Sequence, residues 1–269
     1  MRKGFSLVEL SIVLVILGLL TGGILAGQSL IHAAELRSIT TDYNKYLAAT
    51  RAFRDKYFAI PGDMTNATAF WGSLGGTGAD ATCQAIAATG TATCNGDGDG
   101  SVYNAISTVE RYRFWQHLAN AGLIEGSFTG VAGSGYVPGS NVPLSKISNN
   151  YFSVATSPAY TGSGSTTYDA GNTIIFAGDY GKNYFGYSSA NGTITTAGSL
   201  ALSPADAWNI DTKLDDGVPG TGSLIVFKGD GTNTFCTSAA GVAPPTDAGA
   251  TYKLTNSNKD CLLYFVRAF

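Results

Sequence analysis

The chain opens with Met1-Arg2-Lys3-Gly4-Phe5-Ser6-Leu7-Val8-Glu9-Leu10, and an apolar run then continues as far as Ala26. Between Phe5 and Ala26 the only charged residue is Glu9. An apolar segment of about 20 residues is long enough to cross a bilayer as a helix. Arg2 and Lys3 precede this segment, and basic residues at that end favour a cytoplasmic N-terminus. The stretch therefore predicts a membrane-spanning helix, with the rest of the chain outside the cytoplasm.

A cleaved secretory signal peptide does not fit this stretch. Such a peptide has an apolar segment of roughly 7–15 residues, followed by a small-residue cleavage site. Here the apolar segment is longer, and the small residues Gly22, Gly23 and Gly27 lie inside a continuing helical pattern. A carboxylate inside a membrane segment is costly and is usually paired and functional. Glu9 is therefore a candidate functional residue; the alternative is an ordinary membrane anchor with an incidental glutamate.

The segment from Gly4 to Leu10 resembles the leader and mature start of type IV pilins and type II secretion pseudopilins. In these proteins a glycine precedes a phenylalanine, and a glutamate follows four residues later at the head of a membrane helix. The resemblance implies that a prepilin peptidase cleaves between Gly4 and Phe5, and that Phe5 is then N-methylated. A buried carboxylate needs a cationic partner. The resemblance implies that Glu9 pairs with the new amine of an adjacent subunit and sets the register of assembly.

The helix is predicted to extend well beyond the membrane. Apolar residues recur mostly at helical spacings after Ala26, and no proline occurs before Pro61. One helix from about Phe5 to Phe58 would be ~80 Å long at 1.5 Å per residue. Residues 5–30 are apolar on all sides and suit lipid or copies of the same helix. Residues 31–58 are amphipathic and should pack on a globular domain.

The rest of the chain, residues 59–269, predicts a globular head, after a leader of residues 1–4. Pro61-Gly62 ends the helical pattern. Short helices are expected behind the capping box of residues 107–110 and over residues 204–214. The strongest strand patterns are residues 223–228 and 261–266; weaker ones are 151–155, 173–177, 184–187 and 192–196. The fold class is therefore α+β: a pilin-like fold whose long N-terminal helix packs on an antiparallel sheet with inserted loops and short helices.

Composition narrows the class of protein. Only 13% of residues are charged, and 35 of 269 are glycine, which is common in secreted proteins with many loops. The formal charge of −3 would become −5 if Arg2 and Lys3 were lost with a leader. Without a basic patch in the sequence, no nucleic-acid partner is predicted. No enzyme motif or paired catalytic constellation is present, so an enzyme is not expected.

The chain contains four cysteines, and an even count behind an export signal suggests two disulfides. Sequence proximity favours Cys83–Cys94 and Cys236–Cys261, which is one of three possible connectivities. A metal site is the other interpretation of four cysteines. No Cys-x-x-Cys spacing supports it, and the two histidines, His32 and His117, are far apart in the sequence.

Asn or Asp alternates with glycine from Asn95 to Gly100, which resembles the first half of a calcium loop. The side-chain oxygens of Asn95, Asp97 and Asp99 could converge on one cation. The twelfth loop position is Ile106, where an acid is expected, and Glu110 could substitute only in a different loop geometry. The alternative is a solvated turn. Asp215-Asp216-Gly217 offers a second, weaker cation site, for which a turn is again the alternative.

These features together predict a structural subunit of a type IV pilus-like or type II secretion pseudopilus filament. The expected partners are copies of itself, other pilins or pseudopilins, the prepilin peptidase, an inner-membrane assembly platform and, before assembly, membrane lipid. The expected location is the inner membrane with the head in the periplasm, followed by a periplasmic or cell-surface filament. The alternatives are a minor subunit that initiates or tips the filament, and a membrane-anchored adhesin or binding protein.

Overall fold

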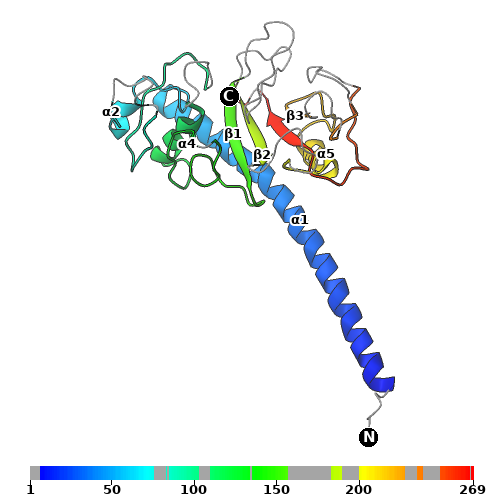
Figure 1. Cartoon of the computed structure of the whole chain (residues 1–269). Helices are drawn as coiled ribbons and strands as arrows, with labels where there is room; N and C mark the ends of the chain where they lie inside the picture. Colours follow the sequence, from blue (N-terminus) through cyan, green and yellow to red (C-terminus); the bar gives the residue numbers. More distant parts are fainter. Residues whose placement is uncertain are drawn as a thin grey trace.

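The computed structural model describes residues 7–75, 83, 85–102, 110–133, 135–156, 183–189, 200–227, 235–238, 249–266 and 268–269. Its main element is helix α1, Leu7–Tyr57, which has 51 residues. The N-terminal half of α1 projects away from the head, while the C-terminal half lies against it (Figure 1). The predicted continuous helix is therefore present over Leu7–Tyr57, and its second half packs on the head (Figure 1).

Helix α1 ends where the backbone adopts a left-handed conformation. Phe58 has a positive φ of 52°, in the left-handed region that terminates helices. Its N–H donates to the carbonyl of Arg54 at 2.9 Å, and a turn at Pro61–Asp63 follows. The chain thus leaves the helix within one residue of the predicted end.

The described residues of the head include three further helices and one sheet. The helices are α2 (Ala67–Trp71), α4 (Glu110–Asn120) and α5 (Pro204–Leu214). The strands are β1 (Asn150–Thr156), β2 (Asn183–Ser189), β3 (Leu224–Phe227) and β4 (Leu262–Phe265), and they lie in the order β1-β2-β4-β3 with antiparallel neighbours throughout. The α+β fold class is confirmed. The strands predicted at 173–177 and 192–196, and the first part of the capping box at 107–109, lie outside the described residues.

The core lies where the second half of α1 meets the sheet and α4. Tyr43 stacks on Phe265 of β4 with ring centroids 4.0 Å apart. One turn further on, Tyr46 contacts both Trp115 of α4, at 5.0 Å, and Phe152 of β1, at 5.3 Å. Aromatic pairs in these geometries add to the stabilisation from burial alone. The amphipathic half of α1 is thus the base on which the head is built.

Helix α5 attaches the C-terminal part of the head to α1. Ser203 caps α5 by accepting the N–H of Asp206, as its position before Pro204 predicts. Asp206 in turn bonds to α1, because its Oδ1 lies 2.7 Å from Nε2 of His32. His32 precedes Leu36, the first buried residue of α1. This pair is named the His32–Asp206 clasp below, and it lies at the edge of the contact between head and helix.

Both disulfides join the cysteines that are closest in sequence. Cys83 pairs with Cys94, with a Cα–Cα distance of 5.9 Å, and Cys236 pairs with Cys261, at 5.2 Å. The first closes the loop beside α4, and the second fixes residues 235–238 to the residue that precedes β4. Each cross-link restricts the unfolded chain and so favours the folded head.

His117 of α4 is a packed residue. Its Nδ1 accepts the N–H of Gly62 at 2.9 Å, and its Nε2 lies 3.0 Å from the hydroxyl of Thr93. Complete burial, reinforced by the charge of Arg113, lowers the pKa of His117 to about 3. The imidazole is therefore neutral at physiological pH, and it holds the turn after α1 against α4.

Candidate functional site

The first half of α1 presents an apolar surface on every side. From Leu7 to Ile31 its large apolar side chains are all exposed, and none of its most apolar 18-residue window is buried. Among the residues that the structure describes, α1 is the helix long and apolar enough to cross a membrane. Its hydroxyl groups bond within the helix: Ser11 to the carbonyl of Val8, and Thr21 to that of Leu17, both at 2.9 Å. Such internal bonding is what a lipid or helix–helix environment requires.

Glu9 is the single charge on this apolar surface. It lies in the first turn of α1 and is exposed. An anion near a helix N-terminus is favoured by the helix dipole. Further along, Gly18, Gly22 and Gly23 have open space where a Cβ would lie, so a second helix could approach closely there. The predicted cleavage and methylation residues, Gly4 and Phe5, lie outside the described residues.

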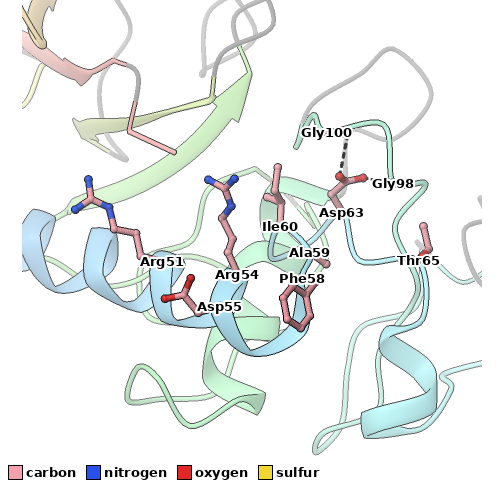
Figure 2. A pocket seen from close by; sticks show the side chains of 10 residues that line it. All are labelled: Arg51, Arg54, Asp55, Phe58, Ala59, Ile60, Asp63, Thr65, Gly98 and Gly100. Carbon is pink, nitrogen blue, oxygen red and sulfur yellow. Dashed lines mark hydrogen bonds between the residues drawn. The ribbon is translucent and has the colours of Figure 1, made fainter.

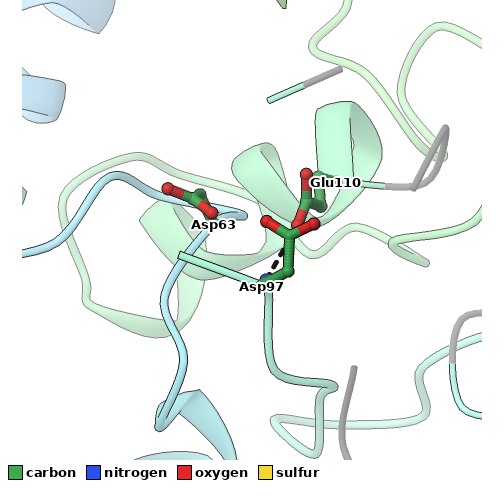
Figure 3. A group of neighbouring side chains, drawn as sticks. All are labelled: Asp63, Asp97 and Glu110. Carbon is green, nitrogen blue, oxygen red and sulfur yellow. Dashed lines mark hydrogen bonds between the residues drawn. The ribbon is translucent and has the colours of Figure 1, made fainter. Parts of the chain in front are cut away.

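A second candidate site is a group of three acids in the head. Asp63, Asp97 and Glu110 each offer a carboxylate oxygen, and these oxygens all lie within 4.8 Å of one another (Figure 3). Asp63 lies in the turn after α1, Asp97 in the glycine-rich loop, and Glu110 at the start of α4. Asp63 and Glu110 are buried, whereas Asp97 is exposed. We call this group the acidic trio.

The glycine-rich loop is fixed to the turn after α1 by backbone hydrogen bonds. The N–H of Gly96 donates to the carbonyl of Met64 at 2.9 Å. The N–H groups of Gly98 and Gly100 donate to the two carboxylate oxygens of Asp63 at 2.6 and 3.0 Å. A Cβ on Gly96 would lie 2.4 Å from the backbone of Asp63. Glycine is therefore needed at 96 for the loop to approach this closely.

The acidic trio concentrates negative charge where little water reaches it. Burial raises the pKa of Asp63 to about 6; the N–H groups of Gly100 and Gly98 oppose this, and the charges of Asp99 and Asp97 add to it. Glu110 is fully buried, and its Oε1 accepts the N–H of Asp97 at 3.1 Å. Close carboxylates cannot all stay ionised without cost. Oxygen ligands in this arrangement can hold a hard cation such as Ca²⁺.

The structure brings together only part of the predicted ligand set. Of the four predicted residues, Asp97 and Glu110 belong to the trio. The side-chain oxygen of Asn95 instead accepts the N–H of Thr68 in α2 at 2.9 Å, and Oδ1 of Asp99 accepts the N–H of Ser101 at 2.7 Å. Ile106, at the predicted twelfth loop position, lies outside the described residues.

Asp63 was not among the predicted ligands. It follows Pro61-Gly62, a pair that in the sequence indicates a turn and nothing more. In the sequence, the available signal is that one glycine-containing turn carries an acid, and that a second such turn, far away in the chain, has backbone N–H groups that could bind this acid. That signal is too common to identify a site without the fold.

The acids around Asp215 form a second group in which the side chains build a turn. Oxygens of Asp211, Asp215 and Asp216 lie within 4.8 Å of one another. Asp215 accepts the N–H of Leu224 at 2.8 Å, Asp216 accepts the N–H of Val218 at 2.8 Å, and Asp211 accepts the hydroxyl of Tyr252 at 2.6 Å. The bond of Asp215 joins the end of α5 to β3, and the bond of Asp216 builds a local turn, which is the alternative considered from the sequence.

Comparison with known proteins gives one match. Residues 1–25 match the family model described as the prokaryotic N-terminal methylation motif, which is the prepilin-type signal of type IV pilins and pseudopilins. No curated protein and no solved structure matches the chain. The N-terminus is thus that of a pilin-type precursor, a structural rather than enzymatic class, and it fits anchoring in the inner membrane and processing by a prepilin peptidase.

Proposed function

We propose that the protein is a structural subunit of a type IV pilus-like or type II secretion pseudopilus filament. One observation carries the proposal: the prepilin-type signal runs into a helix whose apolar half is not covered by any part of the chain that the structure describes. The proposed sequence of events is insertion in the inner membrane with the head in the periplasm, removal of residues 1–4, methylation of Phe5 and polymerisation through α1.

The apolar half of α1 supports polymerisation physically. Apolar surface is stabilised by roughly 25 cal/mol per Å² when it leaves water. Lipid supplies that cover before assembly, and the same half of neighbouring subunits can supply it afterwards. Because lipid and neighbouring helices are about equally apolar, close packing and specific polar contacts must favour the filament. The open glycine positions and Glu9 provide both.

Two other roles start from the same precursor. A minor subunit that initiates or tips the filament would use the same helix, but only a few copies would be present. A membrane-anchored adhesin or binding protein would keep the helix in lipid and never polymerise. The number of copies in sheared filaments distinguishes a minor subunit from the main one. Retention in the membrane fraction distinguishes an anchored adhesin or binding protein from a filament subunit.

The first prediction concerns processing. Co-expression with a prepilin peptidase should yield a mature chain that begins at Phe5 and carries one N-methyl group, measured by mass spectrometry of the intact protein. Gly4→Ala should leave the precursor uncleaved, while Gly27→Ala, a matched change further along the same helix, should be processed normally. A precursor that keeps its leader in an assembly-competent cell would contradict the proposed route.

We also propose that the acidic trio binds Ca²⁺ in the periplasm or outside the cell. Its support is the convergence of Asp63, Asp97 and Glu110, two of which are buried, beside a loop whose N–H groups bind the carboxylate of Asp63. A divalent cation would offset their mutual repulsion, and extracellular sites of millimolar affinity are filled at ambient calcium.

The second prediction concerns calcium and pH. At a free Ca²⁺ concentration 100 times Kd, binding adds about 2.7 kcal/mol of stability, so the unfolding midpoint should rise by several degrees over the midpoint in EDTA. Since the pKa of Asp63 is raised to about 6, the ionised carboxylate destabilises the calcium-free head as pH rises through that value. The gain from calcium should therefore be larger at pH 7.5 than at pH 5, measured by differential scanning calorimetry.

The control for this prediction lies in the second acidic group. Asp97→Asn should abolish the calcium response, because it removes a charge from the trio at an exposed position. Asp216→Asn, an exposed change of the same kind outside the trio, should keep it. Equal midpoints in calcium and EDTA at pH 7.5 would rule out the site.

A further inference from the structure

A hollow of about 710 Å³ lies beside the C-terminal end of α1, which is the end remote from its apolar half (Figure 2). Arg51 and Arg54, in the last turns of α1, form one side of this hollow. Asp63, Gly98 and Gly100 form the other side. Volumes of this size are typical of ligand sites in proteins. The groups that line the hollow indicate which kind of ligand it suits.

The side formed by α1 is cationic. The side chains of Arg51 and Arg54 are exposed and extend in the same direction from the helix (Figure 2). Neither guanidinium forms a salt bridge within the described part of the chain. A guanidinium is always charged, and it binds carboxylates through paired N–H donors. This side of the hollow therefore suits an anionic group.

Hydrogen-bond acceptors lie beside these cations. Asp55 and Thr65 line the same hollow, and both are exposed. A carboxylate accepts hydrogen bonds only, and a threonine hydroxyl can both donate and accept. A closely charged polyanion such as a nucleic acid would bring phosphates next to Asp55, on a chain whose formal charge is already −3. The lining thus favours a ligand that has few charges and many hydroxyl donors.

Phe58 adds an exposed aromatic ring to the lining of the hollow. Its side chain is 93% exposed, more than any other large apolar side chain in the described part of the chain. Its positive φ of 52° is unusual for a bulky residue, and strained backbone of this kind often occurs where function requires it. The ring points to the opposite side from the guanidinium of Arg54 (Figure 2). A ligand that reaches both groups must therefore extend across the hollow.

We propose that this hollow binds an acidic oligosaccharide, a short chain of sugar rings that carry carboxylate groups. The carboxylates bind to Arg51 and Arg54. The sugar hydroxyl groups donate to Asp55 and Thr65, and the apolar face of one ring lies on Phe58. All of these residues belong to one copy of the chain, so the site does not depend on the proposed filament.

The test is binding to the purified full chain in detergent, with a trimer of galacturonic acid and its methyl ester as matched probes. The ester keeps the hydroxyl groups of the ring and removes the charge. Isothermal titration calorimetry is carried out in EDTA, which prevents calcium from bridging carboxylates. The acid should bind more than about tenfold more tightly than the ester, because hydrogen bonds between charged groups are stronger than those between neutral groups.

Variants test the two sides of the hollow separately. Arg51→Gln with Arg54→Gln should weaken binding of the acid by more than about tenfold and leave binding of the ester unchanged. Lys213→Gln is the control, because Lys213 is exposed on α5 and does not line the hollow; this variant should bind as wild type.

Phe58→Gly separates a binding role of the ring from a structural one. It should weaken binding of both probes by roughly fivefold, since the ring then offers no surface to the sugar. Its unfolding midpoint should equal or exceed that of wild type, because glycine adopts a positive φ without strain. A structural role of Phe58 predicts a lower midpoint instead, and that result would remove the ring from the site.

Other outcomes would overturn the proposal. These are failure of the acid to bind, equal affinity for the acid and the ester, and wild-type affinity in the arginine variant. Inorganic phosphate that binds as tightly as the trimer would show contact with any anion and no saccharide site. A single-stranded oligonucleotide or an acidic peptide that binds more tightly than the trimer would assign the hollow to another partner. Filament assembly does not enter these measurements, so failure of the site and failure of the proposed filament are distinguishable.

Discussion

Glu9→Ala is expected to remove the protein from filaments while leaving it in the membrane. Glu9 is the single charge on the apolar half of α1, and the proposed partner of its carboxylate is the amine that cleavage creates on Phe5 of a neighbouring subunit. Removing one member of a buried ion pair costs about 3–5 kcal/mol, which is more than a hundredfold in an association constant. Immunoblots of sheared filament and membrane fractions measure the result.

Ser11→Ala is the matched control for Glu9. Ser11 lies half a turn away on the same apolar surface, but its hydroxyl bonds to the carbonyl of Val8 in its own helix. This variant should assemble normally. If Glu9→Ala also assembles at the wild-type level, Glu9 does not act in assembly, and the anchored binding protein becomes the better interpretation of the helix.

Phe53→Ala should give the largest loss of head stability among changes in α1. Phe53 is fully buried, and the centroid of its ring lies 4.5 Å from that of Tyr57, 6.1 Å from that of Trp71 and 6.4 Å from that of His117. Truncating a buried phenylalanine typically costs about 3–5 kcal/mol. For a head of this size each kcal/mol corresponds to about 2–4 °C. Thermal unfolding of the full chain in detergent should therefore shift down by roughly 6–20 °C.

Phe58→Ala provides the control for that change, because it removes the same side chain five residues later. Phe58 is 93% exposed, and substitutions at such positions usually alter stability by less than about 0.5 kcal/mol. A shift for Phe58→Ala as large as that for Phe53→Ala would show that the base of the head is not where the structure places it.

The sequence predicted the elements whose evidence is local. Helix α1 follows from apolar residues at helical spacing with no proline before Pro61, and α5 follows from Ser203 and Pro204 at its start. Strands β3 and β4 follow from short runs of branched and aromatic residues. The order β1-β2-β4-β3 could not be predicted, because pairings such as Phe185 with Phe265 depend on contacts far apart in the sequence.

The candidate sites also differ in how much of their evidence is local in the sequence. Glu9 was identifiable because a charge in an apolar run is conspicuous on its own. The acidic trio could be identified only in part. More than thirty residues of chain separate Asp63 from Asp97 and Glu110, and the fold brings them together where Gly96 bonds to Met64. Asn95 shows the converse: its spacing suits a cation ligand, yet its oxygen is used by the N–H of Thr68 in α2.

The His32–Asp206 clasp has a mechanical consequence for a fibre under tension. A pull along α1 places the contact between helix and head under shear, and the buried residues from Leu36 to Phe53 share this load. A bending load would instead separate the head from α1, starting at one end of their contact. At the end nearer the apolar half of α1, the clasp is the first connection to carry that load, and its 2.7 Å contact joins partners 174 residues apart. A tilting head would therefore strain an exposed polar pair before it opened the aromatic core.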